Sequence, residues 1–132
     1  MTDAGLSERY RAYIACLNAQ DWDRLGEFVA DNARHNGRPF GLAGYRSMLE
    51  QDFRAIPDLH FAIDLLVIEP PHVAARLAFT CTPVGDFLGL PVNGRTVSFT
   101  ENVFYRFSSG RIVEVFSIVD RQAIAAQVKG RA

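Results

Sequence analysis

Two acidic residues in the second half of the chain have the type and setting needed for proton transfer. Asp120 directly follows the apolar, β-branched run 112–119, and Glu101 lies in an earlier run rich in Val and Phe. Burial raises the pKa of a carboxyl group, and a nearby second carboxylate raises one of the two pKa values further. Such a group can take a proton from a carbon next to a carbonyl and later return one. We therefore treat Asp120 and Glu101 as candidate catalytic residues.

Asp120 also has a purely structural interpretation. An Asp directly before the run Arg121-Gln-Ala-Ile is typical of a helix N-cap, which contributes roughly 1 kcal/mol. Glu101 can equally be an edge-exposed or salt-bridged acid. Capping and proton transfer are compatible roles for Asp120, because a carboxylate has two oxygens, and the residue pattern leaves both open.

The distance between the two acids depends on a predicted β-hairpin. Alternating patterns over 96–107 and 111–119 flank Ser109-Gly110, a turn-forming pair. Symmetric pairing about this turn makes Glu101 and Asp120 diagonal neighbours on one face, roughly 7–8 Å apart. A bulge would reverse the facing of one strand. Without a bulge, the face shared with the acids carries Phe99, Val103, Phe116 and Ile118.

Arg76 and His35 are further polar residues of interest. Arg76 lies in the middle of a predicted strand, where a charge needs a partner. Either Asp64 on the preceding strand pairs with it, or Arg76 holds a substrate carboxylate or an enolate oxygen. His35 lies in a polar loop, where an imidazole can simply be exposed. The three His residues lack ligand spacing beside a carboxylate, so no metal site is expected.

Helical periodicity in the first half of the chain and strand alternation in the second predict an α+β fold. We expect helices packed on one face of an antiparallel sheet, in one domain comprising residues 1–132. The predicted elements are helices over 6–17, 22–29 and 45–56, a loop over 31–40 with a short strand near His35, strands over 61–68, 73–82, 96–107 and 111–119, and a last helix over 121–128.

The composition and charge of the chain argue against some classes of binding partner. A net charge of −1, with 22% charged residues, argues against a nucleic-acid-binding protein. No run has the length of a membrane span and no secretory signal is visible, so we expect no membrane partner and a cytoplasmic location. Both faces of the last two strands are apolar. Helices can cover one face, and a homodimer through the sheet is expected to cover the other.

Several segments spread over nearly the whole chain carry a family resemblance. They are NAQD at 18–21, IPDLHF at 56–61, TCTPVGDFLGLPVNGRTV at 80–97, VFYRFSSGRIVE at 103–114, and Asp120 with Gln127. Together they resemble the SnoaL-like polyketide cyclase (ester cyclase) family of the nuclear transport factor 2-like superfamily. The resemblance implies a cone-shaped α+β barrel, in which N-terminal helices pack into a strongly curved, mostly antiparallel sheet.

The resemblance also implies an activity. In this family an acid at the position of Asp120 acts as general acid/base in an intramolecular aldol ring closure, without metal or cofactor. It implies a hydrophobic polycarbonyl small molecule as substrate, folded so that its two ends meet. His35 matches a position where relatives often have a pocket-facing histidine, so His35 and Glu101 join Asp120 as candidate catalytic residues. The candidate substrate-binding residues are Arg76, Phe99, Val103, Phe116, Ile118, Trp22 and Phe53.

Two departures from the family pattern concern the pocket. Pro83 stands where family members usually have the His of Gly-Thr-His-x-Gly, and Phe116 stands where they usually have Trp. The superfamily also contains isomerases, dehydratases, epoxide hydrolases and non-catalytic binding proteins, and fold alone does not choose among them. A ketosteroid-isomerase-like isomerase or dehydratase, or a small-ligand-binding module, are therefore the alternative hypotheses.

Overall fold

The computed structural model describes residues 1–129, of which the first half is mainly helical and the second half mainly strands. This order confirms the predicted α+β class. In chain order the elements are α1 (Asp3–Ala19), the 3₁₀ helix η1 (Trp22–Glu27), β1 (Val29–His35), α2 (Gly41–Ala55), β2 (Ala62–Glu69), β3 (His72–Cys81), β4 (Asp86–Phe87), β5 (Leu90–Pro91), β6 (Val97–Ser108), β7 (Arg111–Val119) and α3 (Arg121–Lys129).

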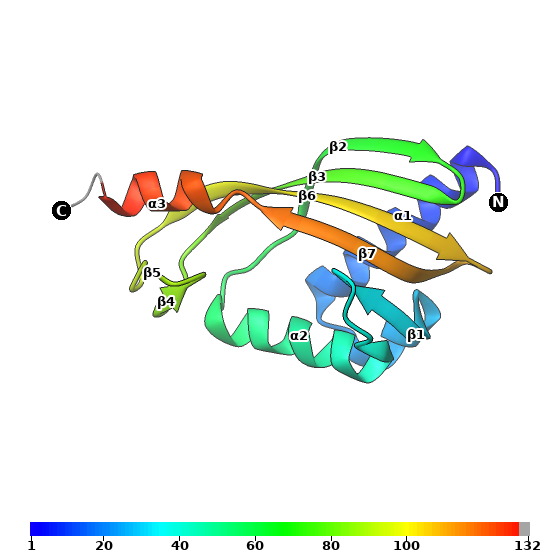
Figure 1. Cartoon of the computed structure of the whole chain (residues 1–132), viewed down its shortest axis with the longest axis horizontal. Coiled ribbons are helices and arrows are strands. Elements are labelled where there is room, and N and C mark those ends of the chain that lie inside the picture. The colour runs from blue at the N-terminus through cyan, green and yellow to red at the C-terminus, as the bar shows by residue number, and fades with distance from the viewer. Residues whose placement is uncertain (130–132) are drawn as a thin grey trace.

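A five-stranded mixed sheet forms the centre of the molecule, in the order β1-β7-β6-β3-β2. Its strands pair antiparallel except for β1, which runs parallel to β7. Helices α1 and α2 lie on one side of the sheet, and α3 continues outward from the end of β7 (Figure 1). The buried hydrophobic residues of helices and sheet form one core cluster between these layers. No helix within residues 1–129 is long and apolar enough to cross a membrane.

The predicted second helix and the loop after it differ from the structure. Only Trp22–Glu27 is helical, as a 3₁₀ turn, and the chain from Val29 to His35 is strand β1. Val29 pairs with Ile112 of β7, and the Ile112 backbone N–H donates to the Phe28 carbonyl over 2.7 Å. Pairing with a distant strand therefore overrides the local helical pattern, and the short strand predicted near His35 is the end of a longer one.

The predicted hairpin at Ser109-Gly110 is present, with Ser108 paired to Arg111 and Phe107 to Ile112. Both turn residues have positive φ, 51° and 77°, as a type I′ turn requires, and the glycine adopts that conformation without steric cost.

Beyond these two pairs, a β-bulge reverses the predicted facing of β7. Arg106 pairs with Glu114 rather than with Val113, so the register shifts by one residue. A one-residue shift turns every following side chain to the opposite face of the sheet. The helix-covered face of β7 consequently carries Val115, Ser117 and Val119, whereas Phe116, Ile118 and Asp120 are exposed.

Candidate functional site

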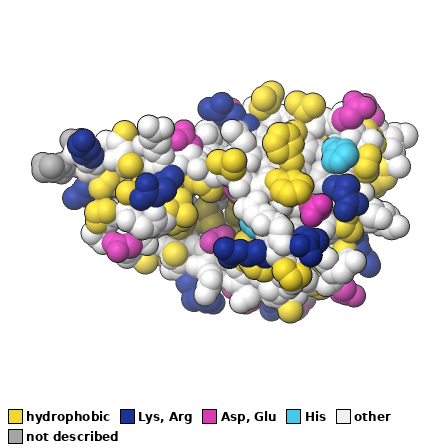
Figure 2. Space-filling view, viewed as in Figure 1, with side chains coloured by type: hydrophobic (Ala, Val, Ile, Leu, Met, Phe, Trp, Pro, Cys, Tyr) yellow, Lys and Arg dark blue, Asp and Glu magenta, His cyan; other side chains and the backbone are white. Residues whose placement is uncertain are grey.

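A pocket of about 390 Å³ lies between the helix-covered face of the sheet and helices α1 and α2. The space-filling view shows the surface hollowed between the end of β7, α2 and the β4–β5 loop, with acidic atoms at the edge of the hollow (Figure 2). Most of the wall is apolar, including Met48, Leu77 and Val103. The polar lining consists of Tyr13, His35, Asn36, Tyr45, Asp52, Glu101, Tyr105 and Ser117.

Glu101 stands in the middle of β6, on the face that the helices cover. Strand alternation places it on that face with the buried residues Phe99, Val103 and Tyr105. The Ser117 hydroxyl, from β7, donates a hydrogen bond to the Glu101 carboxylate. Burial raises the pKa of Glu101, and the Ser117 hydrogen bond opposes part of that rise. The result is an oriented carboxylate that binds a proton more tightly than a free glutamate.

Asp52 enters the same pocket from α2. It follows Tyr45, Met48 and Leu49 by seven, four and three residues, so these four side chains share one face of the helix. Burial raises the pKa of Asp52 from 3.8 to about 6, and the negative charge of Glu101 adds to the rise. No hydrogen bond within residues 1–129 opposes this rise, in contrast to Glu101. The Asp52 carboxyl group therefore keeps its proton to a higher pH than a free aspartate does.

Tyrosine hydroxyls form a second polar feature of the pocket. The hydroxyls of Tyr13 and Tyr45 lie 2.6 Å apart, and the Tyr10 hydroxyl donates to that of Tyr105 over 3.2 Å. Burial raises the pKa of all four well above the usual value, so they stay neutral. Neutral phenols are hydrogen-bond donors, and such donors stabilise an oxygen that gains negative charge.

His35 lies at the end of β1, held by a tight turn. Asn36 and Gly37 have positive φ, 49° and 79°, and the backbones of His35 and Arg38 exchange two hydrogen bonds across them. The His35 ring stacks on Phe40, with centroids 5.7 Å apart. Burial, with a smaller contribution from the Arg38 charge, lowers the pKa of His35. The imidazole is therefore neutral near pH 7.

Asn36 connects this turn to the strand that carries Ser117. Its side chain accepts from the Ser117 backbone N–H over 2.8 Å and donates to the Ser117 carbonyl over 3.2 Å. The turn after β1 thus helps to fix the position of Ser117 on β7, and through Ser117 that of the Glu101 carboxylate.

The pocket is suited to proton transfer on an uncharged, largely apolar ligand. Within the described chain, Asp52 and Glu101 are its acidic lining residues, and no Lys or Arg lines it. Residues 1–129 contain no group of three or more His, Cys, Asp or Glu side chains arranged to hold a metal ion. Two carboxyl groups with raised pKa values can exchange protons with such a ligand.

Comparison with protein families matches residues 7–128 to the SnoaL-like polyketide cyclases. The chain belongs to this family. A SnoaL-like polyketide cyclase from Agrobacterium tumefaciens has a similar crystal structure, with 52% identity and a TM-score of 0.93 over 97% of this chain and 99% of that one. The expected nuclear transport factor 2-like fold is thereby confirmed. A search of curated proteins found no match.

Solved structures with lower sequence identity are similar to this chain in fold alone. IdmH from Streptomyces antibioticus has 24% identity and a TM-score of 0.81, over 94% of this chain and 98% of that one. AclR from Streptomyces galilaeus, described as a candidate hydroxylase, has 21% identity and a TM-score of 0.79, over 98% of both chains. The reaction of this SnoaL-like protein must therefore be argued from its own pocket.

The expected burial of Asp120 in the pocket is wrong. Its side chain is exposed, and its Oδ1 accepts a hydrogen bond from the Ala123 backbone N–H over 3.1 Å. Asp120 therefore caps α3, as the structural interpretation predicted. The physical reason is the bulge, which places Asp120 on the opposite face of the sheet from Glu101.

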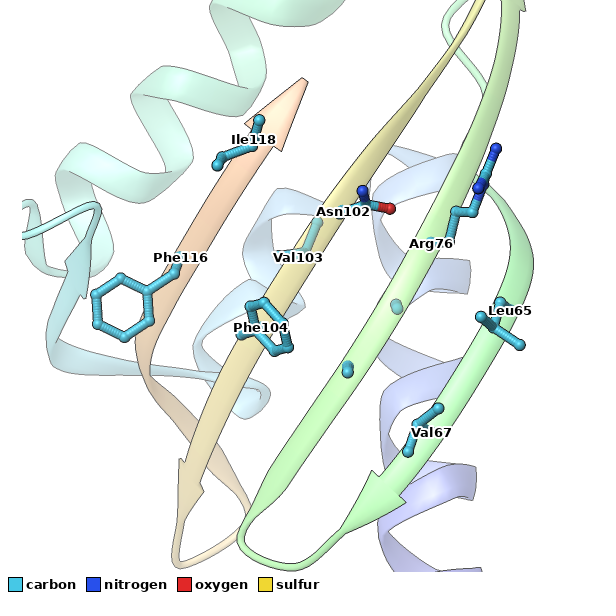
Figure 3. A pocket seen from close by; sticks show the side chains of 10 residues that line it. Leu65, Val67, Arg76, Asn102, Val103, Phe104, Phe116 and Ile118 are labelled. Atoms are coloured by element: carbon cyan, nitrogen blue, oxygen red, sulfur yellow. The ribbon is translucent and has the colours of Figure 1, made fainter. Parts of the chain in front are cut away.

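Arg76, Phe116 and Ile118 also lie outside the pocket, on the outer face of the sheet (Figure 3). Arg76 pairs with Asp64, with Nε and Oδ2 3.3 Å apart and both side chains about half exposed. The structural alternative for Arg76 is therefore confirmed. Phe116 and Ile118 are 51% and 75% exposed, so their placement in the pocket wall is corrected.

Three predicted wall residues belong to aromatic packing beside the pocket instead. Trp22 contacts Phe53 edge to face, with ring centroids 5.7 Å apart, and Phe53 is buried in the core. Phe99 stacks on Phe79 at 5.1 Å. None of the three predicted residues lines the pocket, whereas His35, Glu101 and Val103 do.

The sequence patterns did not lead us to Asp52 as a pocket residue, although its position in the predicted helix is unusual. It interrupts the apolar stripe of the third predicted helix between Leu49 and Phe53. An acid at that position faces the interior and has to be protonated, paired or functional. No sequence pattern marked Ser117 as a pocket residue, because the bulge decides which face of the sheet its side chain is on.

Proposed function

We propose that this SnoaL-like protein closes a ring in a hydrophobic polycarbonyl compound by an intramolecular aldol reaction, with Glu101 as the general base. Family membership supports the reaction class. The observation that supports the base is the Glu101 carboxylate, which lines the pocket, is partly buried there and is oriented by Ser117. Glu101 takes the role expected of Asp120, whose side chain is exposed.

In the proposed reaction, Glu101 removes a proton from a carbon next to a carbonyl. The electron pair of that C–H bond forms an enolate, whose carbon attacks a second carbonyl carbon of the same molecule. A C–C bond forms, and the electron pair of the second C=O bond moves to its oxygen. Protonation of this alkoxide completes the aldol. Protein side chains can supply both proton transfers, so the proposal needs no metal or cofactor.

The pocket also offers stabilisation for the enolate oxygen. Only one proton of the Tyr13–Tyr45 pair lies between the two hydroxyls, so the second can be donated to a ligand. Donors aimed at a developing oxyanion contribute roughly 10²- to 10³-fold each to the rate. We keep His35 as a proposed group that positions the substrate in the pocket. Its ring is neutral and lies beside that of Tyr45.

An isomerase is the second candidate, because the same tyrosine pair could stabilise the enolate of a simple proton shift. The two reactions share proton abstraction and differ in C–C bond formation. A single substrate with two readouts therefore separates them: solvent deuterium uptake reports abstraction, and a cyclic product reports ring closure.

The test uses an aryl-substituted 1,5-diketone, 1-phenylhexane-1,5-dione, whose aldol closure yields a six-membered ring. We expect the wild-type protein to accelerate both deuterium uptake and ring closure. Glu101→Gln should reduce both by roughly 10²- to 10⁴-fold while the fold persists. Glu50→Gln, which removes a partly exposed acid from α2, is the matched control and should retain both.

Each outcome of this test is decisive. Deuterium uptake without ring closure favours the isomerase. Full activity in Glu101→Gln, or no effect of the wild-type protein on either readout, contradicts the proposed function.

We also propose that the partner of this protein is a second copy, bound through the outer face of the sheet. A groove of about 490 Å³ lies there, and Figure 3 shows apolar side chains from β2, β6 and β7 on this face. Patches of this kind are uncommon on monomers. Charges of both signs, Asp64 and Arg76, lie beside the apolar centre, which suits a self-complementary twofold contact. The main exposed apolar residues are Leu65, Val67, Phe104, Phe116 and Ile118.

A further inference from the structure

The proposed ring closure needs a second proton transfer, to the oxygen of the new alkoxide. A base that has just taken the carbon-bound proton lies beside the attacking carbon, whereas the alkoxide oxygen forms on the carbon that is attacked. A second acid on a different wall of the pocket could reach it. Asp52 is the acid in that position, because α2 carries it and β6 carries Glu101.

We propose that Asp52 is the general acid of the reaction, protonating the alkoxide while Glu101 acts as the base. This inference rests on the proposed function and adds a catalytic residue to it. It stands on geometry: both carboxyl groups line one pocket, from a helix and from the sheet that faces it.

The environments of the two acids assign their roles. Ser117 donates a hydrogen bond to Glu101, and such a donor favours the ionised form that a base requires. Asp52 has no such donor within the described chain, and burial raises its pKa to about 6. The hydrogen bond from Ser117 thus favours Glu101 as the base, and the lack of such a donor within residues 1–129 favours Asp52 as the acid.

Apart from Glu101, the titratable side chains that line the pocket with Asp52 are held in their neutral forms. The titratable side chains lining the pocket with it are Tyr13 from α1, His35 from β1, Tyr45 from α2, and Glu101 and Tyr105 from β6. Burial keeps the tyrosines protonated and lowers the pKa of His35. Once Glu101 is ionised, its negative charge is the one that raises the pKa of Asp52, and it favours the protonated form of Asp52.

The proton balance of one cycle closes without a co-reactant. Glu101 gains the proton of the carbon acid, and Asp52 loses its carboxyl proton to the alkoxide oxygen. The product carries one new C–C bond and one hydroxyl group, with no change in composition. After release, one proton passes from Glu101 to Asp52 through solvent in the open pocket, and the starting state returns.

Asp52→Asn separates this role from that of Glu101. The amide has nearly the same shape and keeps a hydrogen-bond donor, but it cannot transfer a proton. On 1-phenylhexane-1,5-dione, Asp52→Asn should retain deuterium uptake and lose roughly 10²-fold or more of ring closure. Glu101→Gln should lose both, and Glu50→Gln on the same helix should lose neither.

A pH profile of the wild-type protein provides a second measurement that needs no variant. Ring closure should fall above pH about 6, where Asp52 loses its proton, whereas deuterium uptake should persist. Asp52→Glu, which can still transfer a proton, should recover part of the ring closure.

The outcomes distinguish the two proposals. Equal ring closure by Asp52→Asn and wild type, or identical pH limits for the two readouts, overturns the role of Asp52 and leaves that of Glu101 intact. Retention of both readouts by Glu101→Gln overturns the proposed function itself. Parallel loss of both readouts in Asp52→Asn, with the fold retained, shows a structural role for Asp52 and also overturns the inference.

Discussion

Replacing Asp52 by Asn should stabilise the protein at neutral and alkaline pH, although it should impair ring closure. Burial raises the pKa of Asp52 from 3.8 to about 6 in the folded protein. The folded state therefore binds this proton more tightly than the unfolded chain, and stability falls as pH rises from below the unfolded pKa through the folded one. The difference of roughly 2 pKa units corresponds to about 3 kcal/mol in the free energy of unfolding.

Asn has no charge to desolvate, so Asp52→Asn should recover most of this free energy at pH 8 and little of it at pH 4. Urea unfolding followed by fluorescence measures the difference, because Trp22 is the single tryptophan and its ring lies against Phe53 of α2. For a domain of this size, about 3 kcal/mol raises Tm by about 10 °C. Glu50→Gln, on the same helix, should change stability by less than about 0.5 kcal/mol.

Two results would refute this reasoning. One is an Asp52→Asn variant no more stable than wild type at pH 8, which would mean that the partly buried carboxylate does not destabilise the folded protein. The other is an equal gain at pH 4 and pH 8, which would indicate better packing rather than a removed charge. A gain confined to high pH, together with lost ring closure, would show a catalytic group retained at the expense of stability.

Three further predictions concern residues around the pocket and on the outer face. Ser117→Ala removes the hydrogen bond that lowers the pKa of Glu101, so the acidic limb of deuterium uptake should move to higher pH. Asp120→Ala removes the N-cap of α3 and should lower the free energy of unfolding by about 1 kcal/mol, with deuterium uptake per folded molecule unchanged. Phe116→Asp places a charge in the proposed dimer contact, so sedimentation should show wild-type dimers and variant monomers; a wild-type monomer would contradict the dimer.

Much of the fold could be predicted from local patterns. The helical stripe ending at Ile56, the alternation from His60 onward and the turn at Ser109-Gly110 all correspond to observed elements. These features depend on near neighbours in the chain, so the sequence displays them directly. Strand β1 could not be predicted in full, because its parallel partner, β7, lies some eighty residues away.

The sequence by itself determined the fold class, the family motifs and the presence of acids within apolar segments. Tertiary structure decided which acid faces the pocket. A single bulge between Arg106 and Phe107 turned Asp120 outward and Ser117 inward, and the packing of α2 beneath the sheet brought Asp52 into the pocket with Glu101. The physical reason is that the facing of a strand residue has a period of two, so one inserted residue reverses it. No local pattern marks where that residue will be accommodated.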